Sequence, residues 1–174
     1  MDKNKLIVIT GGARSGKSSF ALREAAKISG AKAYIATAEA LDEEMRDRIK
    51  NHKKQRATDW DTFEEPIKVI EAIKEIKGTY CSIIIDCLTL WLSNIMQSNA
   101  DVLDEIEKLV LALRDASTLS HIYIVTNEVG MGIVPDNELA RRFRDMAGLL
   151  NQRVAECADE VYLLVSGIPL KVKG

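Results

Sequence analysis

The sequence predicts an α/β fold in which one mostly parallel sheet is flanked by helices and ends in a C-terminal strand pair. Short apolar segments alternate along the chain with longer segments whose apolar residues recur every three or four positions. Strands that alternate with helices in this way are typical of parallel sheets, because each crossover returns the chain through a helix. We find no linker, internal repeat or low-complexity stretch, so residues 1–174 are expected to form a single domain.

Each strand is predicted from a short apolar run bounded by turn residues or glycines. Residues 5–10 end at Gly11-Gly12, residues 31–36 follow Gly30, and residues 81–85 end in Asp86. The remaining predicted strands are 121–126, 160–165 and 168–172. Because Pro169 has no N–H to give to a ladder, the last of these is expected at the edge of the sheet.

The helices are predicted from apolar periodicity and from their end signals. The expected ranges are 16–29, 42–55, 66–78, 88–97, 102–117 and 137–158. Gly30 and Gly78 stop the first and third of these, and Pro66 opens the third. The apolar face of the last helix is expected to comprise Leu139, Phe143, Met146, Leu150, Val154 and Cys157.

Composition excludes several classes of protein. Hydrophobic residues make up 47% and charged residues 29%, which are ordinary values for a globular chain. A net charge of −2 and an aromatic content of 5% speak against a nucleic-acid partner. The early apolar run Leu6-Ile7-Val8-Ile9 is too short for membrane insertion, so a cytoplasmic protein is expected. Cys81, Cys87 and Cys157 match no zinc spacing and are expected to be buried or half-buried thiols.

A phosphate-binding loop is predicted directly after the first strand. The run fits the pattern Gly-x-x-x-x-Gly-Lys-Ser/Thr between a strand and a helix, and comprises Gly11, Gly12, Ala13, Arg14, Ser15, Gly16, Lys17 and Ser18. Glycines let backbone N–H groups turn toward phosphate oxygens, and the helix N-terminus adds positive charge. Lys17 is expected to reach the outer phosphates and Ser18 to bind Mg²⁺, which makes the fold P-loop NTPase-like.

A second metal ligand is predicted at the end of the strand over residues 81–85. A carboxylate there, Asp86, can hold Mg²⁺ beside the phosphate loop, although capping of the following helix is an alternative role. Ligands of parallel α/β sheets bind beyond the carboxyl ends of the strands. Residues 11–18, 37–39, Asp86 and 127–132 are therefore expected to surround one crevice.

The segment 46–56 is locally basic and contains His52. On a helix, Met45, Ile49, His52 and Arg56 share one face. From spacing alone a solvated basic helix is favoured, and an anion-binding patch with a histidine nucleophile is the alternative. The roles of three arginines and of three aromatic or histidine side chains are also considered. The arginines 141, 142 and 144 either face a second anion or a neighbouring subunit, or are solvated. Trp60, Trp91 and His121 are expected to be structural.

Several stretches together resemble the bifunctional adenosylcobinamide kinase / adenosylcobinamide-phosphate guanylyltransferase family. Four are continuous: Thr10-Gly11-Gly12-Ala13-Arg14-Ser15-Gly16-Lys17-Ser18, Tyr34-Ile35-Ala36-Thr37-Ala38, Asp86-Cys87-Leu88-Thr89-Leu90-Trp91 and Thr126-Asn127-Glu128-Val129-Gly130-Met131-Gly132-Ile133-Val134-Pro135. A spaced set comprises Glu44-Met45, Arg48-Ile49, His52, Arg56, Trp60, Thr62 and Glu64. Arg144-Asp145, Asn151-Gln152 and the run 165–168 also fit. Ala57 departs from the family, which usually has proline there.

The resemblance implies two reactions. ATP or GTP phosphorylates adenosylcobinamide, and GTP then gives GMP to adenosylcobinamide phosphate through a GMP–histidine intermediate at His52. Lys17 and Mg²⁺ would offset charge on the phosphates. The resemblance also implies a homotrimer and places these residues around the nucleotide: Ala36, Thr37, Ala38, Lys53, Lys54, Gln55, Arg56, Glu64 and Asp86. Two alternatives remain: a monofunctional P-loop small-molecule kinase, and a GTP-binding switch, whose usual Asn/Thr-Lys-x-Asp motif is absent after the strand over 121–126.

Overall fold

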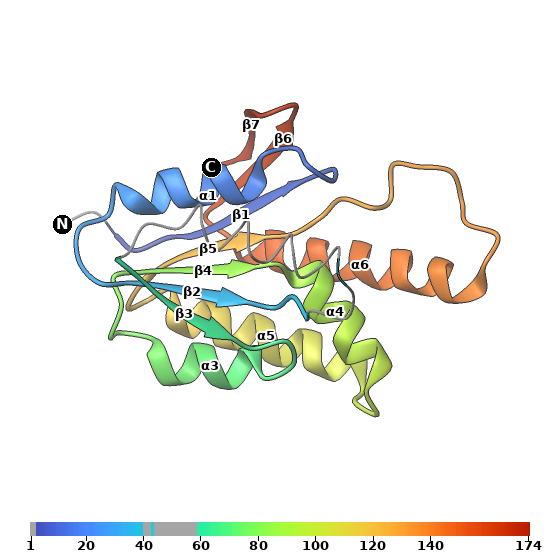
Figure 1. Cartoon of the computed structure of the whole chain (residues 1–174), viewed down its shortest axis with the longest axis horizontal. Helices are drawn as coiled ribbons and strands as arrows, with labels where there is room; N and C mark the ends of the chain where they lie inside the picture. The colour runs from blue at the N-terminus through green and yellow to red at the C-terminus, as the bar shows by residue number, and fades with distance from the viewer. Residues whose placement is uncertain (1–2, 40–42, 44–58) are drawn as a thin grey trace.

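The computed structural model of the chain describes residues 3–39, 43 and 59–174. Its described strands form one seven-stranded sheet in the order β3-β2-β4-β5-β1-β6-β7 (Figure 1). Every neighbouring pair is parallel except β6 and β7, which are antiparallel. The strands are β1 Leu6–Gly11, β2 Lys32–Ala36, β3 Trp60–Glu64, β4 Ser82–Asp86, β5 His121–Val125, β6 Glu160–Val165 and β7 Ile168–Lys173. The predicted α/β class and the C-terminal strand pair are confirmed.

Helices cover both faces of the sheet. They are α1 Lys17–Ala26, α3 Val69–Ile76, α4 Leu88–Gln97, α5 Val102–Ala116 and α6 Glu138–Cys157. Alternate residues of each strand point to opposite faces, so two cores form. Ile9 and Ile84 pack with α1 on one face, while Val8 and Ile85 pack with the other helices on the opposite face. Trp91 is fully buried in the second core, as expected of a structural aromatic residue.

Local sequence explains where these helices begin. The Asp101 carboxylate accepts the Leu103 and Asp104 N–H groups at the start of α5, and Asn137 accepts the Ala140 N–H at the start of α6. Helix α3 begins at Val69, three residues later than the predicted start at Pro66. The helix predicted over residues 42–55 lies outside the described residues, apart from residue 43.

Strand β3 was not predicted from the sequence. It pairs with β2 alone and forms one edge of the sheet, and several of its side chains are exposed. An edge strand needs no continuous apolar run, so the pattern that identifies the central strands is missing. Its anchor is Trp60, whose ring meets that of Tyr34 edge-on with centroids 6.4 Å apart.

Two predictions about side-chain burial were wrong. Leu139 is 66% exposed, because the first turns of α6 extend beyond the edge of the sheet together with the preceding loop (Figure 1). Cys81 is exposed because it precedes β4 rather than lying in it, whereas Cys87 is buried and Cys157 is half-buried as expected. None of the described helices is long and apolar enough to cross a membrane.

Candidate nucleotide-binding site

The phosphate loop connects β1 to α1 at the carboxyl edge of the sheet. Gly11 has a φ of 146° and Gly16 a φ of 92°, values that disfavour residues with a side chain. A Cβ atom on Gly11 would lie 2.5 Å from the Leu164 carbonyl oxygen. The Gly167 N–H donates to the Ser15 carbonyl oxygen at 3.0 Å, so the turn between β6 and β7 supports the loop from outside. The geometry therefore requires glycine at positions 11 and 16, whereas a Cβ atom on Gly12 would meet nothing within 4 Å.

Lys17 is held over this loop. Lys17 is only 6% exposed, and its Nζ donates a hydrogen bond to the Gly12 carbonyl oxygen at 2.6 Å. Burial lowers the pKa of Lys17 from the ordinary lysine value, and the nearby Cys87 and Asp86 partly offset this effect. Helix α1 carries no acidic residue in its first turn. A buried ammonium group and an unneutralised helix N-terminus favour an anion at this position.

Asp86 lies at the carboxyl end of β4, two strands away from the phosphate loop. Its Oδ2 accepts a hydrogen bond from the Tyr34 hydroxyl at 2.5 Å. Thr37 joins the ends of β2 and β4: its N–H donates to the Asp86 carbonyl oxygen, and its hydroxyl group both donates to and accepts from the Cys87 backbone. Asp86 therefore lies where hydrogen bonds from Thr37 join two strand ends. The Thr37 hydroxyl is used in bonds to the Cys87 backbone.

A buried polar network fixes the chain as it leaves β5. The Thr126 hydroxyl donates to Asn151 Oδ1 at 2.7 Å, and Asn151 Nδ2 donates to the Asn127 carbonyl oxygen at 3.1 Å. The Asn127 N–H donates to the Thr89 hydroxyl at 2.7 Å. The next N–H, that of Glu128, donates to the Gly11 carbonyl oxygen at 3.0 Å. The loop after β5 is therefore attached directly to the phosphate loop.

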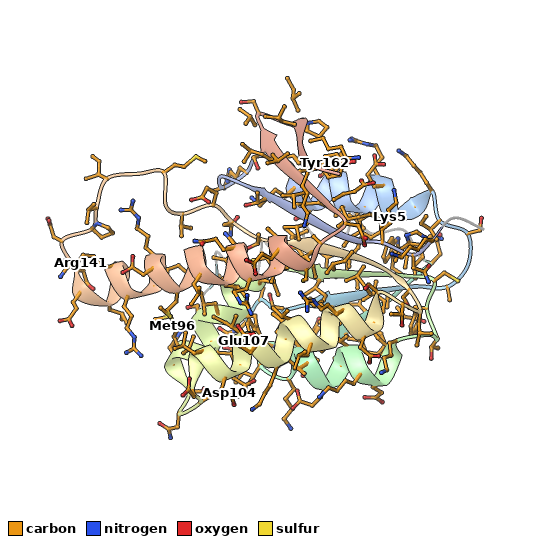
Figure 2. The ribbon with its side chains drawn as sticks, turned by 180° about the vertical axis from the view of Figure 1, so that it is seen from behind. Lys5, Met96, Asp104, Glu107, Arg141 and Tyr162 are labelled. Atoms are coloured by element: carbon orange, nitrogen blue, oxygen red, sulfur yellow. The ribbon has the colours of Figure 1, made fainter. Side chains whose placement is uncertain are left out.

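Two arginines of α6 hold the far part of the same loop. Arg141 Nη1 donates to the carbonyl oxygens of Pro135 and Asp136, and Arg144 donates to that of Gly130. Figure 2 shows Arg141 near the outer end of α6. Arg141 and Arg142 are both exposed, in keeping with the solvated alternative, and Arg144 is half-buried; the attachment of the loop by Arg141 and Arg144 was not predicted.

The structure brings most of the described predicted site residues to one edge of the sheet. The carboxyl ends of β1, β2, β3 and β4 meet there, which gathers residues 11–18, 36–38, Glu64 and Asp86. His52, Lys53, Lys54, Gln55 and Arg56 lie outside the described residues. Sequence reasoning missed the positioning roles of Thr89, Asn151 and Arg144. Asn151 and Arg144 were noted as matching residues, but no local pattern indicates their partners.

The fold and the phosphate loop define a P-loop nucleotide-binding protein. A crystal structure of the RadB recombinase has the same arrangement, with a TM-score of 0.56 and 12% identity over 91% of this chain and 73% of that one. The chain belongs to the cobinamide kinase / cobinamide phosphate guanyltransferase family, whose model matches residues 7–172.

Two curated relatives illustrate this membership. The bifunctional adenosylcobalamin biosynthesis protein CobP of Pseudomonas aeruginosa is 42% identical over 169 residues, covering 96% of both chains. The bifunctional adenosylcobalamin biosynthesis protein CobU of Salmonella typhimurium is 40% identical over 186 residues, covering 97% of this chain and 99% of its own. The resemblance identified from the sequence motifs is confirmed.

Proposed function

We propose that this chain phosphorylates adenosylcobinamide with ATP or GTP and then transfers GMP from GTP to adenosylcobinamide phosphate, giving adenosylcobinamide-GDP and pyrophosphate. The observation that carries this proposal is the phosphate loop with buried Lys17 at its centre, in a chain of the cobinamide kinase family. Backbone N–H groups of the loop and Lys17 hold the phosphates of the donor. They also offset the charge that develops on the leaving group.

Mg²⁺ is the metal that the site fits best. Ser18 on α1 and Asp86 on β4 offer oxygen ligands, and the described residues contain no cluster of three or more His, Cys, Asp or Glu side chains that could hold a metal alone. A metal that takes few protein oxygens and completes its shell with phosphate and water is typical of Mg²⁺. When bound, Mg²⁺ neutralises charge on the transferring phosphates. Ser18 and Asp86 would hold it in place.

We further propose that His52 carries the GMP. One imidazole nitrogen attacks the α-phosphorus of GTP, the bond to the bridging oxygen breaks, and pyrophosphate leaves with the electron pair. A phosphate oxygen of the acceptor then displaces His52. Lys53, Lys54, Gln55 and Arg56 follow His52 in sequence and are proposed to surround the nucleotide with Ala36, Thr37, Ala38, Glu64 and Asp86. The shared edge of β2, β3 and β4 supports the second group.

Incubation with α-labelled GTP and Mg²⁺, followed by denaturing electrophoresis, tests this function. The wild-type chain is expected to carry label that is lost in acid and persists in base, because a protonated phosphoramidate nitrogen leaves readily. His52→Ala should abolish the label and guanylyl transfer while phosphorylation of adenosylcobinamide survives. His121→Ala is the matched control, because His121 lies at the amino end of β5, away from the phosphate loop, and it should label normally.

A wild-type chain that phosphorylates adenosylcobinamide but never labels would support the monofunctional kinase instead. Label on His52→Ala would place the nucleophile elsewhere. Nucleotide exchange without either transfer would favour the GTP-binding switch.

We also propose a homotrimer. The projecting loop and the start of α6 expose Met131, Ile133, Val134 and Leu139, each at least 62% accessible. Exposed apolar side chains gathered on one projection are typical of contact surfaces. Light scattering should give three times the monomer mass, and Ile133→Asp should lower this mass.

The remaining proposals are a single domain over 1–174, a cytoplasmic location and no nucleic-acid partner. They are supported by the ordinary composition and the net charge of −2.

A further inference from the structure

A cleft of about 270 Å³ lies between α6 and the sheet, on the face opposite α1. Apolar side chains of Val8 and Val161 line it together with the polar side chains of Thr10, Asn151 and Gln152. Glu128 also lines the cleft, as do Thr126, Gly148 and Ala155. An opening with polar groups beside an otherwise apolar core has the composition of a small-molecule site.

The cleft adjoins the phosphate loop. Thr10 immediately precedes Gly11, the first residue of that loop, and the Glu128 N–H donates to the Gly11 carbonyl oxygen at 3.0 Å. Both residues therefore connect the cleft to the place where the donor phosphates are proposed to bind. A group held in the cleft lies next to the phosphates without competing for the same N–H groups.

Gly148 keeps this cleft open. It lies within α6 and lines the cleft, and a Cβ atom built on it would meet nothing within 4 Å. Glycine inside a helix destabilises it relative to alanine. Neither a positive φ nor a close contact accounts for this glycine. An unfilled space beside a glycine that packing does not require indicates room for a ligand.

The Thr10 hydroxyl is a second sign of a ligand. Its Oγ1 is buried, and it has no hydrogen-bond partner among the residues that the structure describes. Buried polar atoms in native proteins are nearly always paired, with protein, water or ligand. A hydroxyl or amide group of a ligand, or a water in the cleft, would satisfy this atom if the side chains that cover it shift.

The charge of the cleft defines the ligand further. Glu128 is the one charged side chain among its lining residues, all of which the structure describes, and no cation lines it. A phosphate group is therefore disfavoured there, whereas a neutral arm with hydroxyl and amide groups is accommodated. Oε1 of Glu128 accepts the Gly130 N–H at 2.5 Å, which fixes the carboxylate at the cleft.

From these observations we infer that the cleft binds the hydroxyl-bearing arm of the phosphoryl acceptor and that Glu128 receives the hydroxyl proton. This inference rests on the proposed kinase activity and adds the acceptor site and the base. The acceptor O–H bond breaks and its proton passes to the Glu128 carboxylate. The oxygen bonds to the γ-phosphorus, and the bond from that phosphorus to the β-phosphate oxygen breaks, leaving the electron pair on the nucleoside diphosphate.

Glu128→Gln tests the base. Glutamine retains an oxygen for the Gly130 N–H but cannot take the proton, so kcat for phosphorylation should fall at least about 100-fold with little change in KM. Self-labelling by α-labelled GTP should persist, which shows an intact nucleotide site. Glu128→Asp should recover part of kcat. Wild-type kcat in Glu128→Gln would overturn this role, and so would equal loss of labelling, which indicates a structural one.

Gly148→Leu tests the cleft. A leucine side chain occupies the open space, so KM for adenosylcobinamide should rise at least about tenfold while self-labelling stays normal. Arg142→Leu is the matched control, because it adds the same side chain to an exposed position of α6. Unchanged acceptor KM in a folded Gly148→Leu would overturn the acceptor site. Should that variant not fold, the smaller Gly148→Val gives the same measurement. Failure of the wild-type chain to phosphorylate adenosylcobinamide would instead count against the proposed function.

Discussion

The Tyr34 hydroxyl donates a hydrogen bond to Asp86 Oδ2 across the adjacent strands β2 and β4, at 2.5 Å. Tyr34 is only 2% exposed, so the contact is made from within the core. One carboxylate oxygen of Asp86 is thus engaged by the protein, and the carboxylate is held in one orientation at the sheet edge. This orientation bears on how Asp86 binds Mg²⁺.

Asp86→Asn and Tyr34→Phe are both expected to raise the Mg²⁺ concentration needed for half-maximal phosphorylation. The first change removes a charge and the second releases the carboxylate, so Tyr34→Phe should have the smaller effect. A Mg²⁺ titration of the kinase rate measures both, and excess Mg²⁺ should restore part of the activity. An unchanged Mg²⁺ dependence in Asp86→Asn would assign Asp86 to a nucleoside contact, because the N-cap of α4 is Cys87.

Lys17→Ala should slow both reactions at least about 100-fold, because a charge-assisted contact to the phosphates is lost.

Nucleotide binding by the wild-type chain should also weaken at alkaline pH. Lys17 binds phosphate only when protonated, and burial lowers its pKa. Nucleotide affinity is therefore full below the pKa of Lys17 and declines as pH rises through it, beginning below the ordinary lysine value. Calorimetric titration over a pH series, compared with Lys17→Arg, measures this decline.

The three thiols should differ in reactivity. Burial raises the pKa of Cys87 to about 12, so its thiolate is scarce at neutral pH, whereas Cys81 is exposed. With iodoacetamide at pH 8, Cys81 should be modified first and Cys87 only after unfolding, as peptide mass spectrometry can show. Guanidinium-denatured protein is the control in which all three react. Equal rates for Cys81 and Cys87 in native protein would contradict the buried position of Cys87.

Glu160→Gln should destabilise the fold by roughly 1 kcal/mol at neutral pH. The Lys5 ammonium group, 2.6 Å away, and the Tyr162 hydroxyl lower the pKa of Glu160 to about 2. Figure 2 labels both partners. Because the folded pKa is depressed, this stabilisation is present above the ordinary glutamate pKa and is lost as pH falls toward 2. Urea unfolding at several pH values should show the difference shrinking on acidification, with the exposed Glu75→Gln unaffected.

The sequence predicts the central strands and the phosphate loop because their signals are local. A buried strand such as Ser82–Asp86 is a short apolar run, and the loop after Leu6–Gly11 is a continuous motif. The edge strand Trp60–Glu64 lacks such a run and was missed. The exposure of Leu139 was also missed, because periodicity shows which residues share a helix face but not how far the sheet extends beneath it.

Contacts between distant residues could not be predicted. Thr89, Thr126 and Asn151 meet only because α4, β5 and α6 converge, and nothing in the local sequence of any of them indicates the other two. The role of Arg144 in holding the loop after β5 is likewise evident only from its hydrogen bond to the Gly130 carbonyl oxygen. The acceptor cleft is of the same kind, since Thr10, Glu128 and Gly148 come from separate parts of the chain.

The support of the phosphate loop by the turn between β6 and β7 has a consequence for synthesis on the ribosome. The loop precedes α1, but Leu164, which lies against Gly11, and Gly167, which bonds to Ser15, are made only after α6. A growing chain that has formed β1 and α1 still has an unsupported loop. We therefore expect the loop to acquire its nucleotide-binding geometry only after β6 and β7 have been made, long after the loop itself.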